Sequence, residues 1–248
     1  MKGWAKKEFV GYDAHILALD SCMGKLQNAL DKAGITENTI LVFTSDPGEM
    51  MGSQGVRPKQ KQVPWAESVK VPFLLRYPAR YRNKKLVIDA PINTPDILPT
   101  LLTLAGLPVH DAIEGEDMSR AIENKEETAD KVALIMSVSP FAGKADEYRG
   151  IYTRRYAYVK TLKGPWFLFD LDNDPLQIHN LVGKPGHEDL QKDLELMLNR
   201  ELAAVGDEFM PRQYYIDKWG YKLTERGHID YSAGAEFQGP GLNKSEKE

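Results

Sequence analysis

The sequence predicts an α/β protein in which a mixed sheet with helices is followed by a small C-terminal antiparallel-sheet-and-helix subdomain. Residues 13–33 place apolar side chains at three- and four-residue steps, the spacing of one helix face. Residues 39–44 read TILVFT, a β-branched apolar run of the kind that is buried on both faces of a parallel or mixed sheet. Residues 150–161 instead alternate small, charged and aromatic side chains, as antiparallel strands do.

The same patterns predict the remaining elements and the division of the chain. We expect strands at residues 71–77, 132–138 and 166–171, and helices at residues 95–105 and 190–205. Three regions follow: a larger α/β part over residues 1–130, a small α+β subdomain over residues 131–210, and an aromatic and polar tail over residues 211–248. The tip of the tail, residues 238–248, has little to bury and is expected to be disordered.

Composition excludes several classes of protein. The 248 residues are 42% hydrophobic and 27% charged, which is ordinary for a globular chain. A net charge of -4 leaves no basic footprint for nucleic acid, so we expect no nucleic-acid partner. Cys22 is the single cysteine, which excludes an internal disulfide. Residues 1–12 lack the apolar core of a signal peptide, and no stretch approaches the length of a membrane span.

Five segments, in order along the chain, resemble the sulfatase family of the alkaline-phosphatase superfamily. Residues 43–55, FTSDPGEMMGSQG, are similar to the strand followed by T-S-D-H-G or A-D-N-G in that family, and residues 61–72, KQVPWAESVKVP, are similar to its K-Q-x-P-x-x-E-S-x-R-V-P block. The other three are residues 12–20 (YDAHILALD), 96–108 (DILPTLLTLAGLP), and 168–175 (LFDLDNDP) with Asn180 and Leu181. Five blocks in the family's order are far more specific than any one of them.

The resemblance implies a partial alkaline-phosphatase/sulfatase-like sheet, with residues 1–130 as the C-terminal part of the catalytic domain. It implies chemistry in which a cysteine in a C-x-(P/A)-S-R motif, oxidised to formylglycine, attacks a sulfate ester while a divalent cation, usually calcium, neutralises the sulfate oxygens. This chain has no such motif, because Cys22 is followed by M-G-K-L. The family places its nucleophile and a metal-binding Asp pair before these segments. We therefore expect a C-terminal portion that is incomplete or inactive alone, from a family whose members are often exported.

Asp46 matches the metal-binding aspartate of the family, and it follows a strand, where α/β sheets place their sites. The alternative is a structural Asp-Pro-Gly turn, which those three residues favour for backbone reasons alone. Pro47 stands where the family has His or Asn, and it offers no ligand atom. A calcium site at Asp46 is therefore expected to be incomplete in this chain.

Lys61 matches the family lysine that contacts the sulfate, because an ammonium is a point charge suited to a tetrahedral anion. Lys59 lies two positions away, so the assignment could belong to it instead, and a solvated loop lysine is the alternative for either residue. Gln54 stands where many relatives have His. It cannot act as an acid or base, and we expect a cleft contact at most.

Other polar residues point to no site. Asp170, Asp172 and Asp174 lack the Gly and Glu that a calcium-binding loop requires, so we expect a turn there. None of the five histidines has metal-ligand spacing. The favoured hypothesis is a sulfuric ester hydrolase that acts on a small-molecule or saccharide sulfate ester. The alternatives are a phosphate or phosphonate monoester hydrolase of the same superfamily, and a non-catalytic remnant or interaction protein.

Overall fold

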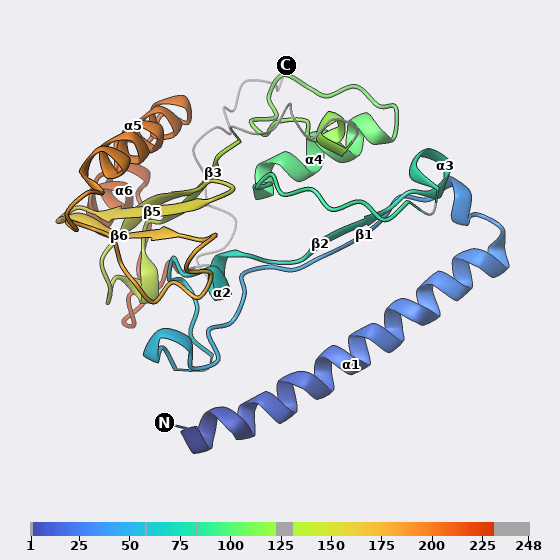
Figure 1. Ribbon diagram of the computed structural model, residues 1–248, viewed down its shortest axis with the longest axis horizontal. Helices are drawn as coiled ribbons and strands as arrows, with labels where there is room; N and C mark the ends of the chain where they lie inside the picture. Colours follow the sequence, from blue (N-terminus) through green and yellow to red (C-terminus); the bar gives the residue numbers. More distant parts are fainter. Residues whose placement is uncertain (1, 58, 83, 123–130, 231–248) are drawn as a thin grey trace. The chain divides into compact units, whose positions relative to one another are not determined.

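The computed structural model describes residues 2–57, 59–82, 84–122 and 131–230 (Figure 1). The chain forms two compact units. The first comprises Met1–Ala133, Tyr152–Tyr156 and Asp170–His179, and the second comprises Leu134–Ile151, Ala157–Phe169 and Asn180–Glu248. The division at residues 1–130, 131–210 and 211–248 stays a prediction, and the tip at 238–248 lies outside the described residues.

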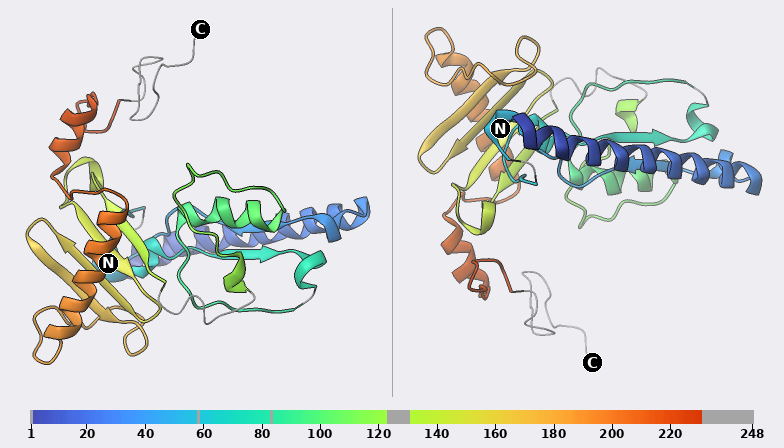
Figure 2. Two further views of the ribbon diagram at one scale, coloured as in Figure 1. Left: turned by 90° about the horizontal axis from the view of Figure 1, so that it is seen from above. Right: turned by 90° about the horizontal axis from the view of Figure 1, so that it is seen from below.

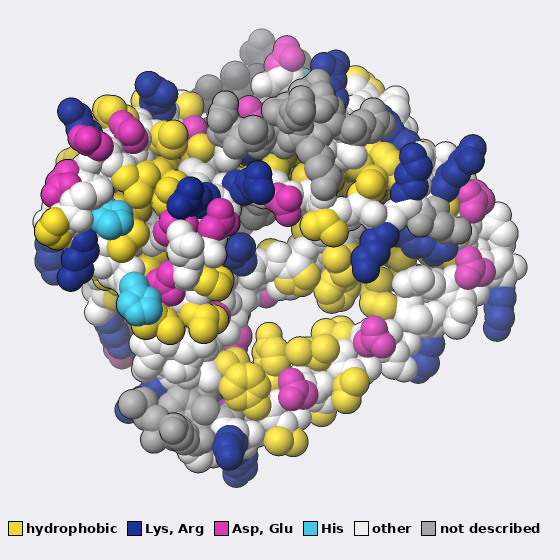
Figure 3. All heavy atoms as spheres, in the orientation of Figure 1, with side chains coloured by type: hydrophobic (Ala, Val, Ile, Leu, Met, Phe, Trp, Pro, Cys, Tyr) yellow, Lys and Arg dark blue, Asp and Glu magenta, His cyan; other side chains and the backbone are white. Residues whose placement is uncertain are grey.

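Helix α1, Lys2–Ala33, opens the first unit and ends at Gly34, whose left-handed φ of +67° suits glycine. The helix predicted at residues 13–33 is confirmed, and it begins eleven positions earlier than expected. Much of its apolar surface is exposed, as Figure 3 shows along its length. The exposed apolar side chains of α1 are Phe9, Val10, Tyr12, Ile16, Leu17, Leu19 and Leu26.

Strands β1, Leu41–Thr44, and β2, Phe73–Arg76, form a two-stranded antiparallel sheet in the described part of the chain. Leu41 pairs with Arg76 and Thr44 with Phe73. The positions predicted for both strands are confirmed. The expectation that β1 is buried on both faces is wrong, because three of its four side chains are half-buried and that of Thr44 is exposed.

Short helices and one longer helix complete the first unit. Helix α4, Thr94–Leu104, begins with a capping box in which Asn93 and Asp96 satisfy each other's backbone amides, and this confirms the helix predicted at residues 95–105. Asp96 also accepts a hydrogen bond from the Glu116 amide, which ties α4 to the loop after it. The remaining elements are α2 (Ala66–Val69), α3 (Pro78–Tyr81) and the 3-10 turns η1 (Thr36–Asn38), η2 (Ser53–Gly55) and η3 (Ser119–Ile122).

A four-stranded sheet follows, in the order β3-β4-β5-β6 (Figure 2). Its strands are β3 (Ala133–Ser137), β4 (Tyr148–Tyr152), β5 (Tyr156–Thr161) and β6 (Gly164–Asp170). The strands expected at residues 132–138 and 166–171 are confirmed. The expectation of one strand over residues 150–161 is wrong, because Thr153 forms a turn there: its hydroxyl accepts from the amides of Arg155 and Tyr156 and separates β4 from β5.

Helix α5, Glu188–Ala204, lies across one face of this sheet (Figure 2) and confirms the helix expected at residues 190–205. Its buried stripe is Leu194, Leu198 and Leu202. Glu195 on the same helix accepts hydrogen bonds from Tyr158 and Lys160 of β5, which fixes the helix along the strand. No helix among the described residues has the length and apolar composition needed to cross a membrane.

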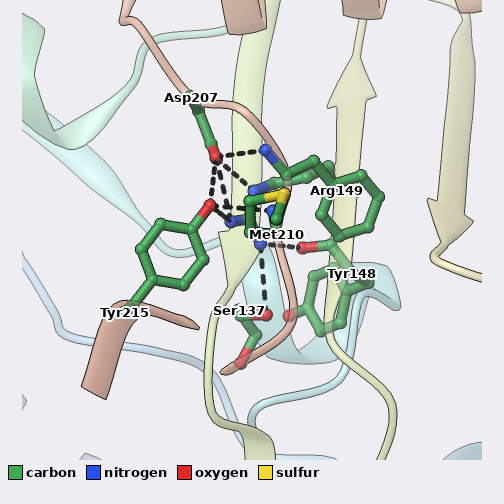
Figure 4. Close-up of polar contacts among 7 residues, drawn as sticks. Ser137, Tyr148, Arg149, Asp207, Met210 and Tyr215 are labelled. Carbon is green, nitrogen blue, oxygen red and sulfur yellow. Dashed lines mark hydrogen bonds and ion pairs between the residues drawn. The ribbon is translucent and has the colours of Figure 1, made fainter. Parts of the chain in front are cut away.

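A buried polar cluster joins helix α6, Arg212–Trp219, to the sheet (Figure 4). The side chain of Arg149 on β4 is 1% exposed and forms an ion pair with Asp207. Tyr215 of α6 donates its hydroxyl to the same carboxylate at 2.7 Å. Because all five residues of β4 are buried, Arg149 cannot point to water, and its charge is satisfied inside the unit instead.

Candidate functional site

The structure brings Asp46 and Lys61 together. Asp46 lies two residues after the end of β1, and its Oδ2 is 3.9 Å from the Lys61 Nζ. The side chain of Asp46 is 81% exposed and that of Lys61 is 45% exposed. An exposed ion pair at this distance contributes about 0–1 kcal/mol to stability. Both charges therefore face solvent, where a ligand can reach them.

A short backbone contact at Gly48 brings the turn after β1 close to α2. The Gly48 amide donates to the Ser68 carbonyl at 2.7 Å. A Cβ at this position would lie 1.9 Å from the Glu67 carbonyl oxygen, so any side chain there would push the two segments apart. Gly48 is therefore required for reasons of space, and it fixes the turn that carries Asp46.

Glu49 and Met50 hold the segment that carries Lys61. The Glu49 Oε1 accepts from the Gln60 amide at 3.2 Å, and the Met50 amide donates to the Gln60 carbonyl at 3.4 Å. Met50 is completely buried, so its side chain anchors this part of the loop in the core. Together these contacts place Lys61, the next residue after Gln60, beside Asp46.

The other two candidate residues lie elsewhere. The Lys59 Nζ is 3.4 Å from the Glu8 Oε2 of α1, while Lys61 is the lysine beside Asp46, so the geometry favours Lys61 for the anion contact. The Gln54 Nε2 donates to the Leu176 carbonyl at 2.8 Å. This hydrogen bond gives Gln54 a structural partner in the loop after β6.

Asp46 has few acidic or histidine neighbours among the described residues. These residues contain no group of three His, Cys, Asp or Glu side chains that could hold a metal ion. Asp46 offers one carboxylate and Pro47 offers no side-chain ligand, whereas calcium takes about 6–8 oxygen ligands.

The three aspartates at the end of β6 and just after it form a turn, as predicted. Asp170 binds Arg155 through both carboxylate oxygens, at 3.0 and 2.7 Å. The hydrogen bond with Arg155 is the main cause that lowers the pKa of Asp170 to about 2. Asp174 accepts from the backbone amides of Ile178 and His179. These carboxylates are occupied by turn contacts rather than directed at a common point.

Sequence reasoning missed two residues that support the Lys61 segment. Gln177 and Tyr152 lie far along the chain, and their side chains hydrogen-bond the backbone at Ala66 and Pro64. Tyr152 lies in strand β4, which also contains Tyr148, and Gln177 lies in a polar turn. Tyrosine and glutamine are common in such places, so neither residue indicates a functional role by its type. The one available signal is that Gln177 lies between the two parts of the fifth sequence block, residues 168–175 and Asn180–Leu181.

The chain is similar to known proteins over most of its length. The sequence model described as "N-sulphoglucosamine sulphohydrolase, C-terminal" matches residues 58–204, more than half of the chain. The model described as "Sulfatase" matches residues 5–107, which include Asp46 and Lys61. The chain belongs to the sulfatase family. An ulvan-active sulfatase of Formosa agariphila is 50% identical over 219 residues, covering 88% of this chain and 43% of the relative.

Solved sulfatase structures have the same fold. One, described as a complex with its substrate D-glucosamine-2-N,6-O-disulfate, gives a TM-score of 0.66 at 25% identity, with 80% of this chain and 40% of that chain covered. A phosphonate monoester hydrolase of Agrobacterium radiobacter, at 21% identity and a TM-score of 0.61 over 86% of this chain and 43% of that one, shares the fold alone. The sulfatase chain therefore spans less than half the length of the proteins it matches, and it corresponds to their C-terminal portion.

Proposed function

We propose that this chain supplies the Asp46 and Lys61 side of the active site of a sulfuric ester hydrolase that acts on sulfated saccharides. The observation that carries the proposal is the 3.9 Å approach of two exposed, opposite charges at the end of β1. Both residues lie inside the sulfatase match, which supports the assignment. The saccharide class is supported by the relative named for its action on ulvan and by the structure with a glucosamine disulfate.

Lys61 would bind and orient the sulfate group. Its ammonium offsets the negative charge of the sulfate oxygens, and a compact point charge tolerates any rotation of a tetrahedral anion. Asp46 would supply one oxygen ligand to a divalent cation, which in this family is usually calcium. The cation would neutralise the sulfate oxygens when it is bound, and its other ligands would come from outside the described residues.

The nucleophile must also come from outside these 248 residues, because no C-x-(P/A)-S-R motif occurs in them. The activity proposed here is that of a whole protein, and this chain would contribute anion binding and one metal ligand to it. A phosphonate ester presents a similar tetrahedral anion. A contact with Lys61 alone therefore does not distinguish a sulfate ester from a phosphonate ester as the substrate.

A chimera tests the proposal. The C-terminal portion of the Formosa agariphila relative would be replaced by the residues of this chain that match it, and hydrolysis of a sulfated saccharide and of an aryl phosphonate would be measured. We expect sulfate release in preference to phosphonate cleavage. Lys61→Ala and Asp46→Ala in the chimera should each lower kcat/KM by about 100- to 1,000-fold, as loss of a charge-stabilising contact does.

Lys59→Ala is the matched control, because that lysine lies beside Glu8 rather than Asp46 and should leave kcat/KM unchanged. Equal activity in the Lys61→Ala and parent chimeras would overturn the role of Lys61. A chimera that folds but releases no sulfate would favour a non-catalytic remnant.

A further inference from the structure

Gln177 forms a buried bridge to the segment that carries Lys61. Its side chain is 2% exposed. The Oε1 accepts a hydrogen bond from the Ala66 amide at 2.7 Å, and the Nε2 donates to the Tyr152 hydroxyl at 3.0 Å. The Tyr152 hydroxyl in turn donates to the Pro64 carbonyl at 2.7 Å. The hydrogen-bonded side chains of Gln177 and Tyr152 therefore hold the backbone at two positions, Pro64 and Ala66, on either side of Trp65.

A second contact holds the other end of the same segment. The Gln54 Nε2 donates to the carbonyl of Leu176, the residue next to Gln177. Leu176 thus binds Gln54, which precedes Lys61 in the chain, and Gln177 binds Ala66, which follows it. Residues between two fixed points have far fewer conformations available than residues of a loop held at one end.

The backbone at Gln177 supports a specific role for its side chain. Its φ is +53°, in the left-handed region that disfavours residues other than glycine. Glycine would relieve that strain but would abandon both side-chain hydrogen bonds. A non-glycine residue persists in such a conformation when its surroundings over-determine it, and here the surroundings are Ala66 and Tyr152.

From these contacts we propose that Gln177 and Tyr152 are positioning residues that hold the backbone at Pro64 and Ala66 so that Lys61 stays beside Asp46. Gln177 is too buried to touch a ligand, so it acts through the backbone of the segment it binds. This inference rests on the proposed role of Lys61 in binding the sulfate group. It extends that role to two residues that lie outside the site and distant from it in sequence.

The test uses the full chain and two measurements. Hydrogen exchange, followed by mass spectrometry, reports the mobility of residues 61–66. Titration with sodium sulfate, followed by NMR of lysine side chains, reports the Kd at Lys61, and Lys61→Ala identifies its signal. Gln177→Met keeps the length of the side chain and removes both hydrogen bonds, and Tyr152→Phe removes the hydroxyl that connects Gln177 to Pro64.

We expect both variants to speed exchange at residues 61–66 by about tenfold or more, since each leaves a buried polar group without its partner. Exchange within β5 should stay unchanged, and the Kd for sulfate should rise by about fivefold or more. Gln177→Gly should give the same result although it relieves the backbone. Gln213→Met, which removes a hydrogen bond between exposed residues of α6, is the matched control and should change neither measurement.

Unchanged exchange at residues 61–66 in Gln177→Met would overturn the proposal, as would an equal increase in β5, which would indicate general destabilisation. Failure of sulfate to shift the Lys61 signal in the unmodified chain would instead overturn the proposed anion role of Lys61. In that case exchange at residues 61–66 still decides whether Gln177 and Tyr152 hold the segment.

Discussion

Asp207 binds the buried guanidinium of Arg149 with a side chain that is itself only 10% exposed (Figure 4). Burial raises the pKa of Asp207, but hydrogen bonds from Arg149 and Tyr215 outweigh burial and hold the pKa below its ordinary value. The Asp207 carboxylate is therefore ionised at neutral pH. It joins β4 to the segment that leads into α6.

Asp207→Ala should lower the free energy of unfolding by about 3–5 kcal/mol, because it leaves the Arg149 charge buried without its partner. Urea denaturation of the chain measures the loss. Lys163→Ala is the matched control: that lysine forms a 2.7 Å pair with Asp146 in the same unit, but its side chain is 77% exposed, so the loss should stay within about 1 kcal/mol. Similar losses in the two variants would contradict the buried-pair account.

The Arg155–Asp170 pair predicts a dependence of stability on acid pH. Binding to Arg155 lowers the pKa of Asp170 from 3.8 to about 2. A lowered pKa in the folded state gives stability that is complete above the ordinary value and is lost as the pH falls through the folded value. The difference in unfolding free energy between the parent chain and Asp170→Asn should therefore be constant near pH 6 and shrink as the pH falls from about 4 toward about 2.

Urea denaturation at several pH values measures this difference. Asp172→Asn serves as the control, because its carboxylate is 65% exposed and lies 3.9 Å from Arg155. It should change stability little at any pH. If the difference for Asp170→Asn grew as the pH fell, the assigned direction of the pKa change would be wrong.

Gly48→Ala should destabilise the chain by about 1–3 kcal/mol or more, because the added methyl group would overlap the Glu67 carbonyl. Gly24→Ala is the opposite case, since nothing lies within 4 Å of a Cβ at that position of α1. It should stabilise the helix by about 0.5–1 kcal/mol. Thermal unfolding of both variants distinguishes them, and a neutral Gly48→Ala would refute the close contact with α2.

The chain alone should not turn over an aryl sulfate or an aryl phosphate, even with added calcium. Members of a covalent catalytic site act as a unit, so the Asp46 and Lys61 side contributes little without a nucleophile. Pro47→His should not create activity either. The assay compares the purified chain with Asp46→Ala. Turnover that disappears in Asp46→Ala would show that a working site forms from residues of this chain that are not identified above.

The sequence indicated Asp46 and Lys61 as site residues through their match to the family blocks and through the position of Asp46 after a strand. Fifteen positions separate them, and periodicity cannot show that a loop returns to its starting point. The contacts that hold Lys61 were beyond prediction for a further reason. Gln177 lies 111 positions after Ala66, and a glutamine in a polar turn is ordinarily exposed.

Strand positions were predicted better than strand environments. Alternation over residues 150–161 correctly indicated antiparallel strands, but the turn at Thr153 interrupts them, and its hydroxyl was the available signal. All of β4 is buried, and Arg149 lies among aromatic and small residues of that strand. A charged residue in an alternating pattern predicts exposure. The ion pair with Asp207, 58 positions later, is what balances the buried charge of Arg149.

The bridge from Gln177 to Ala66 also has a consequence for biosynthesis. A ribosome adds about 5–20 residues each second, so roughly 5–20 s separate the synthesis of the two partners. During that interval the nascent chain already contains Asp46 and Lys61 but lacks the Gln177 side chain that holds the backbone at Ala66. The segment that carries Lys61 therefore acquires its final geometry only after all four strands of the sheet, which end at Asp170, have been synthesised.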